Sequence, residues 1–347
     1  MLVNWKRFFA VLLISALLTG VFTCTQSIPS SGIDESQPPS TAATEPATAP
    51  STQPDPLPPS EGPTLQQATM QPPAWKFVTL PSISAKEFFV YDVEMGDFLY
   101  ISDNTTKQMY PASTTKLFTT YVALQYLSAD DVITVGSELN YVAWDASRVG
   151  FQKGDQVSVK TLAYGALLPS GCDASYILAA AAGRVILGQK NATAKNAIAA
   201  FMEECNRMAK DMGMKKTHLV TPDGYHDPDH KISLQAFVII GKACLENRLI
   251  AKIVSTASTT VSYTKSSGKS TTVTLKNTNY IIHSDNKYYN GNCIGLKTGF
   301  TDAAGYCLLT AYKVNGRYVL IGVFGCKESN DRFKDANKLF HTYLPYL

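Results

Sequence analysis

A sharp change of composition near residue 75 limits how much of this chain can fold. Twelve of the 18 prolines lie between Pro29 and Pro73, and that stretch contains no basic residue. Residues 25–74 are mostly Pro, Ser, Thr, Ala and Gln. A segment with so few large apolar side chains cannot bury enough surface to offset its ordering entropy. We therefore expect a disordered linker over 25–74 and one folded domain over 75–347.

The first 24 residues have the pattern of an export signal. A short basic pair precedes an uncharged apolar run of 15 residues from Phe8 to Phe22. Such a run is short for a membrane span but long enough for a signal peptide. Cys24 follows the run, as in bacterial lipoproteins, although Thr23 is a poor match to the small residue usual before such a cysteine. Lipidation, cleavage near Thr23 and an uncleaved anchor all place the folded domain outside the cytoplasmic membrane, in the cell envelope or beyond.

The charge of the chain excludes a nucleic-acid partner. The formal charge of +3 divides into +2 for residues 1–24, −5 for 25–74 and +6 for 75–347. This mild excess forms no basic stripe of the kind that binds nucleic acid. We expect the membrane to be contacted only through the N-terminus.

Strand patterns stand at both ends of the domain and helical patterns between them. Residues 88–93 and 98–101 form one expected hairpin, and 304–314 and 317–326 form another around an Asn-Gly turn. Residues after 256 are rich in strand-forming types. Apolar periodicity predicts helices over 114–127, 159–168, 173–187, 194–212, 233–246 and 330–343. This order indicates an α+β domain whose two ends meet in one antiparallel sheet.

The tetrapeptide Ser113-Thr-Thr-Lys116 opens one of these helices. Residues three apart share a helix face, so the lysine should lie one turn above the serine hydroxyl. A desolvated lysine can serve as the base that activates a serine nucleophile. An N-cap serine followed by a surface lysine is the alternative. Two other Ser-x-x-Lys matches, at Ser262 and Ser266, lack helix context and are interpreted as chance.

Two further segments are candidates for the same site. Lys297-Thr298-Gly299 ends an apolar stretch, as expected of a strand beside a cleft, where a lysine can bind a carboxylate and glycine permits close approach of a substrate. Ser170 lies between two predicted helices and either passes a proton or caps a helix.

No metal or cofactor site is expected. His226 and His230 are separated by three residues including a proline, which disfavours the helix that would align them. The six cysteines of the domain show no Cys-x-x-Cys spacing and permit 15 pairings, or none.

Taken in order, these motifs resemble the D-Ala-D-Ala carboxypeptidases, the low-molecular-mass penicillin-binding proteins. The resemblance runs from about Ile83 to the C-terminus. It is carried by the segments Tyr110-Pro-Ala-Ser-Thr-Thr-Lys116, Leu168-Pro-Ser-Gly-Cys-Asp-Ala174, Thr221-Pro-Asp-Gly224 and Gly295-Leu-Lys-Thr-Gly-Phe-Thr-Asp-Ala-Ala-Gly-Tyr-Cys307. It implies the transpeptidase-like fold, an antiparallel sheet flanked by a mostly helical subdomain.

The resemblance also implies a role for each motif residue. Ser113 would be acylated, Lys116 would act as its base, and Ser170 would relay a proton to the leaving amine. Backbone N–H groups of Ser113 and Phe300 would form the oxyanion hole. Lys297, Thr298 and Arg332 would hold the carboxylate of a peptidoglycan stem peptide ending in D-Ala-D-Ala, and β-lactams would acylate the serine.

One position departs from the family pattern, which usually has asparagine where this chain has Cys172. A thiol hydrogen-bonds a substrate amide weakly, so slower turnover is expected; the alternative is that this cysteine only packs. Relatives often add a small β-rich domain and a C-terminal membrane anchor. Here the N-terminal tether would anchor the domain instead.

Three other functions compete with hydrolysis of D-Ala-D-Ala. A class A β-lactamase would need a Glu-x-x-Leu-Asn motif after Ser170, and the only echo, Glu138-Leu139-Asn140, lies before it. A non-catalytic wall protein or β-lactam sensor would be expected to have lost a motif residue. Transpeptidation is indistinguishable from hydrolysis by sequence.

Overall fold

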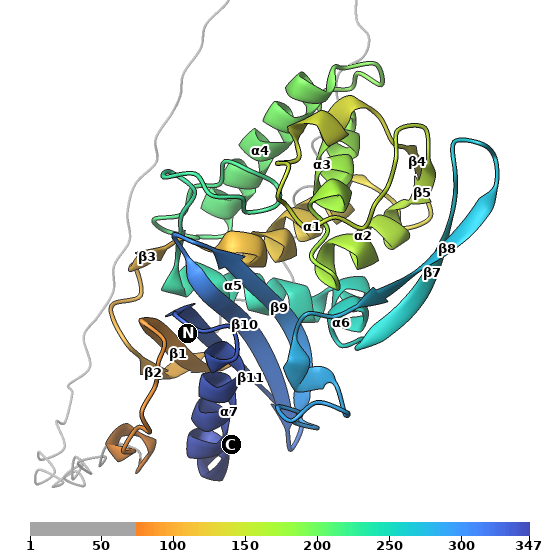
Figure 1. Ribbon diagram of the computed structural model, residues 1–347. Coiled ribbons are helices and arrows are strands. Elements are labelled where there is room, and N and C mark those ends of the chain that lie inside the picture. Colours follow the sequence, from red (N-terminus) through yellow and green to blue (C-terminus); the bar gives the residue numbers. More distant parts are fainter. Residues whose placement is uncertain (1–73) are drawn as a thin grey trace, which may run out of the picture. The chain divides into compact units, whose positions relative to one another are not determined.

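The computed structural model describes residues 74–347, so the expected export signal and nearly all of the expected linker lie outside the described residues. A five-stranded antiparallel sheet of order β2-β1-β11-β10-β9 forms the centre of the described part (Figure 1). Its strands are β1 (Glu87–Asp92), β2 (Asp97–Ile101), β9 (Cys293–Thr301), β10 (Gly305–Val314) and β11 (Arg317–Cys326). Within residues 74–347, no helix is both long and apolar enough to cross a membrane.

The two ends of the domain meet in this sheet, as the sequence predicted. β1 pairs with β11 in a register that runs from Glu87 opposite Phe324 to Asp92 opposite Val319. The β10–β11 hairpin turns at Asn315 and Gly316, whose φ angles of 51° and 84° are those of the expected type I′ turn.

Both faces of the sheet are covered, which explains the nearly continuous apolar sequence of its strands. On one face, Leu320 and Phe324 of β11 pack into the large core shared with the helical part. On the other face, Ile321 and Val323 pack against α7 (Asp331–Tyr343), which Figure 1 shows beside the sheet.

The expected helices are confirmed with ends shifted by at most two residues. They are α1 (Thr115–Tyr126), α2 (Val159–Leu167), α3 (Cys172–Ile186), α4 (Ala194–Asp211), α5 (Leu234–Glu246) and α7. Side-chain oxygens of Ser158, Thr193 and Ser233 cap α2, α4 and α5, respectively. These caps fix where the helices start, while α5 packs against the face of the sheet opposite α7.

Several short elements were not predicted, because they are too short to show a period. They are β3 (Gln108–Met109), β4 (Val132–Thr134), β5 (Gln156–Ser158), β6 (Ile232–Ser233) and α6 (Arg248–Val254). The strand-rich region after residue 256 is confirmed as β7 (Ser258–Thr264) and β8 (Ser270–Lys276). These two strands belong to a second sheet of order β4-β5-β7-β8, and their hairpin projects beyond the helices in Figure 1.

The close packing of α3 against α4 at Gly183 gives a test of the core. A Cβ added at Gly183 of α3 would lie 1.8 Å from the carbonyl oxygen of Ala197 in α4. Gly183→Ala should therefore destabilise the domain by about 2 kcal/mol in urea unfolding, as overpacking does. Without this contact, the helix propensity of alanine would stabilise the domain by about 1 kcal/mol. The sign of the change in the free energy of unfolding therefore shows whether the contact exists. Val185→Ala, at a residue of the same helix that is 52% exposed, should change stability by less than about 0.5 kcal/mol.

Candidate active site

A fully buried lysine and the candidate nucleophile form the centre of the site. Ser113 lies in a 3-10 turn (Ala112–Thr114) that leads directly into α1, and Lys116 occupies the first turn of that helix. The lysine Nζ donates hydrogen bonds to Ser113 Oγ at 2.8 Å, to Cys172 Sγ at 3.3 Å and to the carbonyl oxygen of Asp223 at 2.8 Å. The predicted proximity of the serine and the lysine is confirmed, and the surface-lysine alternative is wrong.

The backbone around the serine is held in an uncommon conformation. Ala112 has a φ of 48° and Ser170 a φ of 68°, both in the left-handed region that costs a non-glycine residue free energy. Gly224 packs directly against the first of these, since a Cβ there would lie 1.9 Å from Ala112 O. Tertiary contacts therefore fix the turn that presents Ser113.

The second motif is anchored beside this turn. Gly171 occupies the N-cap position of α3, so the interpretation of Ser170 as a helix cap is wrong. The carbonyl oxygen of Ser170 accepts a hydrogen bond from Ser147 Oγ at 2.6 Å. The buried carboxylate of Asp173 accepts hydrogen bonds from Val149 N and Gly150 N at 3.0 and 2.8 Å, which fastens the neighbouring loop.

Cys172 is the first residue of α3, and its sulfur contacts the lysine as well as packing in a small apolar cluster. The alternative that this cysteine only packs is therefore wrong. Burial raises the pKa of the Cys172 thiol, and the charge of Lys116 only partly opposes this effect. The group beside the lysine is a neutral thiol.

The third motif lies on β9, at the edge of the five-stranded sheet, as predicted. Lys297 is fully buried, and its Nζ donates a hydrogen bond to Thr298 O at 3.0 Å. Burial holds the pKa of Lys297 well below its usual value, and the charges of Lys116 and Arg332 lower it further. An arriving carboxylate would favour the charged form of this lysine.

Gly299 joins this strand to the nucleophile turn. A Cβ at this position would lie 2.9 Å from Pro111 O and 3.1 Å from Ser113 N. The absence of a side chain at Gly299 therefore admits the Ser113 turn, and close approach of a substrate at this glycine stays a prediction. The next residue, Phe300, is 45% exposed, and its ring stacks on Tyr306 with the centroids 4.3 Å apart.

Arg332 of α7 reaches the same strand. Its Nη1 donates a hydrogen bond to Gly299 O at 3.1 Å, and its guanidinium lies 5.2 Å from the ring centroid of Tyr306. Its Nε is buried and has no acceptor among the described residues. The contacts thus bring Ser113, Lys116 and Cys172 together and place Lys297 and Arg332 beside them, with the carbonyl of Asp223 as a partner that sequence patterns could not identify. The relay role of the Ser170 hydroxyl stays a prediction.

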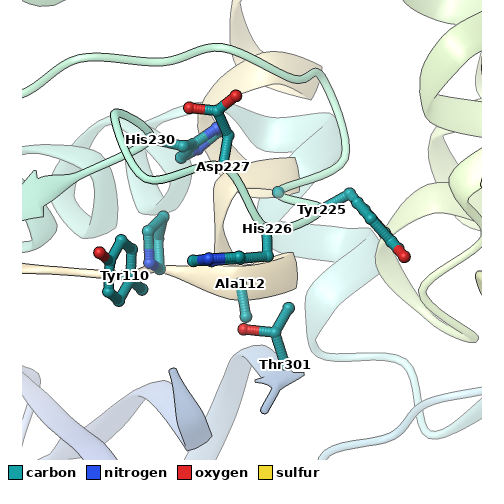
Figure 2. A pocket seen from close by; sticks show the side chains of 9 residues that line it. Tyr110, Ala112, Tyr225, His226, Asp227, His230 and Thr301 are labelled. Carbon is teal, nitrogen blue, oxygen red and sulfur yellow. The ribbon is translucent and has the colours of Figure 1, made fainter. Parts of the chain in front are cut away.

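The loop that carries His226 and His230 borders a hollow beside Ala112, in the turn that presents Ser113, as Figure 2 shows. His230 is buried, and its Nε2 lies 3.0 Å from Thr115 Oγ1, while Nδ1 accepts hydrogen bonds from Val220 N and Thr221 N. This histidine ties the loop to α1. Within residues 74–347, no three His, Cys, Asp or Glu residues are grouped to hold a metal ion. The six cysteines of the domain are free thiols.

Glu138, which belongs to the partial match to the β-lactamase Glu-x-x-Leu-Asn motif, has a structural role. Its side chain is fully buried in the 3-10 helix Ser137–Tyr141, where one oxygen accepts a hydrogen bond from Gly136 N at 2.7 Å. The other oxygen pairs with Arg184 at 3.4 Å. Both carboxylate oxygens are therefore engaged in holding this segment.

Known proteins share this arrangement. The model of the D-alanyl-D-alanine carboxypeptidase family, peptidase S11, matches residues 74–328. A D-alanyl-D-alanine carboxypeptidase of Streptomyces sp. strain K15 is 31% identical over 269 residues, which cover 76% of this chain and 88% of the relative. The chain spans 63% of the length of DacD of Escherichia coli and 61% of that of DacF of Bacillus subtilis, two carboxypeptidases of this kind.

Solved structures agree with the sequence relatives. The Streptomyces K15 DD-transpeptidase matches with a TM-score of 0.69 at 29% identity, covering 77% of this chain and 100% of that one. Penicillin-binding protein D2 of Listeria monocytogenes, in its ampicillin-bound form, matches with a TM-score of 0.60 at 27% identity, covering 77% and 99%. The predicted α+β transpeptidase-like fold is confirmed.

The buried histidine predicts how stability depends on pH. Burial lowers the pKa of His230 to about 4 from its ordinary value of 6.5. The unfolded chain thus binds a proton at a higher pH than the folded chain. The free energy of unfolding is therefore highest, as far as His230 is concerned, above pH 6.5. It falls by up to roughly 3 kcal/mol as the pH falls towards and below 4, because the unfolded chain takes up the proton first.

Thermal unfolding between these pH values should show this loss in the wild type and a smaller slope in His230→Gln. The exposed neighbour supplies a control, since His226→Gln should keep the wild-type slope. Equal slopes in wild type and His230→Gln would contradict the assignment.

Proposed function

The chain belongs to the D-alanyl-D-alanine carboxypeptidase family of serine peptidases, and from this premise we propose that it removes terminal D-alanine from peptidoglycan stem peptides. The observation that carries the proposal is the distance of 2.8 Å between Ser113 Oγ and the Nζ of a wholly buried lysine, Lys116. A buried lysine at this distance can serve as the general base that accepts the proton of a serine hydroxyl.

The reaction would pass through an acyl-enzyme. Ser113 Oγ attacks the carbonyl carbon of the D-Ala–D-Ala bond while its proton moves to Lys116. The backbone N–H groups of Ser113 and Phe300 stabilise the oxyanion, a contribution of about 3 kcal/mol per donor in comparable hydrolases. Ser170 relays the proton to the leaving amine, D-alanine departs, and water hydrolyses the ester.

The terminal carboxylate of the substrate would bind to cations that the site already holds. Lys297 and Thr298 lie on β9, Arg332 binds the same strand at Gly299 O, and the charges of Lys116 and Arg332 lower the pKa of Lys297. A bound carboxylate would relieve this repulsion. The preference for a free terminal carboxylate would follow from that relief.

β-Lactams would acylate the same serine, since their strained amide mimics the scissile bond. The ampicillin-bound Listeria protein shows that a similar fold binds such a compound. Without a carboxylate placed like the base of class A β-lactamases, the penicilloyl-enzyme should persist. Transfer to an amine is a second candidate reaction, because the structure from Streptomyces K15 is described as that of a transpeptidase.

We also propose that residues 1–24 export the domain and that residues 25–74 tether it in the cell envelope. The support is the basic pair, the apolar run from Phe8 to Phe22 and the proline-rich composition that follows. Lipidation at Cys24, simple cleavage or an uncleaved anchor would each meet this need. The tether would let the enzyme reach the wall.

The proposed nucleophile is tested with a diacyl-Lys-D-Ala-D-Ala peptide. The wild type should release D-alanine and become labelled by a fluorescent penicillin, and Ser113→Ala should lose both, because no other group supplies the attacking oxygen. Ser262→Ala, at a chance Ser-x-x-Lys match in β7, should behave as wild type. Release of D-alanine by Ser113→Ala would rule out this mechanism.

The position that departs from the family offers a separate test. Cys172→Asn restores an amide that can donate to and accept from the substrate. We expect kcat for the peptide to rise several-fold, on the order of the 1 kcal/mol of one hydrogen bond. A decrease in kcat with normal folding would show that the thiol suits this site better than asparagine.

A further inference from the structure

The carboxylate of a buried aspartate has no place in the reaction described above. Asp223 is 1% exposed, and its carbonyl oxygen accepts the hydrogen bond from Lys116 Nζ. Its Oδ1 accepts a hydrogen bond from Tyr225 N at 3.0 Å. Its Oδ2 is buried and has no N–H or O–H donor among the described residues, with the weakly donating thiol of Cys172 beside the carboxylate. A buried carboxylate oxygen that is so weakly satisfied is costly, so its retention calls for a purpose.

We propose that the Asp223 carboxylate is a positioning residue that holds the charge of Lys116 while this lysine carries the serine proton. The inference rests on the proposed function and names a further residue for it. The carboxylate acts through Lys116 and does not touch the substrate.

The surroundings of the carboxylate support this role. It lies beside the thiol of Cys172, whose pKa it helps to raise, and that sulfur is 3.3 Å from Lys116 Nζ. The ionisable groups that face Asp223 are Lys116 of α1, Cys172 and Tyr176 of α3, and Tyr225 and His230 of its own loop. Lys116 is the cation in this set, because His230 is neutral above pH 4.

During the reaction, positive charge develops on Lys116, and the Asp223 carboxylate can offset it. Lys297 of β9 repels an ammonium at Lys116, and Arg332 in turn repels Lys297. When Ser113 attacks, its oxygen loses a proton and Nζ gains it, so a third cation forms in a dry site. A fixed anion on the residue whose carbonyl oxygen binds Nζ stabilises that state until the proton moves to the leaving amine, and the proton count is unchanged over the cycle.

This role differs from a structural one, because the hydrogen bond of Oδ1 to Tyr225 N needs an acceptor and not a charge. Asparagine at position 223 supplies that acceptor with nearly the same shape. Asp223→Asn therefore removes the charge and keeps the loop. Asp229→Asn is the matched control, since it removes one charge from the exposed part of the same loop.

The test measures the rate of acylation of the full-length protein by a fluorescent penicillin between about pH 5 and 9. Loss of the anion removes a favourable interaction with the proton that Nζ accepts, so the acidic limb of the Asp223→Asn profile should move down by about one pH unit. The rate on the plateau should also fall, because proton transfer from Ser113 is then less well stabilised. Asp229→Asn should superimpose on wild type.

Coincident profiles for wild type and Asp223→Asn would overturn the inference and leave the proposed function intact. A wild type that is never labelled would overturn both. If circular dichroism shows that Asp223→Asn is unfolded, Asp223→Ser keeps a short acceptor for Tyr225 N without the charge, and the same displacement of the limb is required of it.

Discussion

The burial of one lysine organises the structure. Removing an ammonium from water is expensive unless polar partners surround it. Lys116 finds them on separate segments: Ser113 one turn away, Cys172 at the start of α3, and the Asp223 carbonyl in the loop after α4. The site therefore exists only when all of these segments are assembled. Stability and reactivity depend on the same contacts.

The sheet completes the site from the other side. β9 reaches the nucleophile turn because Gly299 has no side chain, and the Arg332 side chain holds the Gly299 carbonyl from α7. This places a second buried lysine, Lys297, close enough to repel the first. Cations forced together without water form a natural receptor for a carboxylate, and an anion near the first lysine is needed to balance them.

Most of the site could be predicted from sequence, because its motifs use side chains at fixed spacing on regular elements. Ser113 and Lys116 are three residues apart on one helix face, so local geometry was sufficient. Asp223 was not recognised as a partner, since it contacts the lysine through a backbone carbonyl that has no side-chain signature. The strand-forming composition after residue 256 predicted strands there, but not their ends or their partner strands, because three-residue strands such as β4 show no period.

The pairing of β1 with β11 has a consequence for synthesis of the chain. The first strand of the sheet, β1, pairs with β11, which begins more than 200 residues later at Arg317. Until the ribosome has made that strand, β1 and β2 are a lone hairpin, which is marginal in water. The central sheet cannot close early, and its contacts are among the most distant in sequence, which slows folding. Closure of the central sheet therefore has to wait for synthesis of β11, long after β1 has been made.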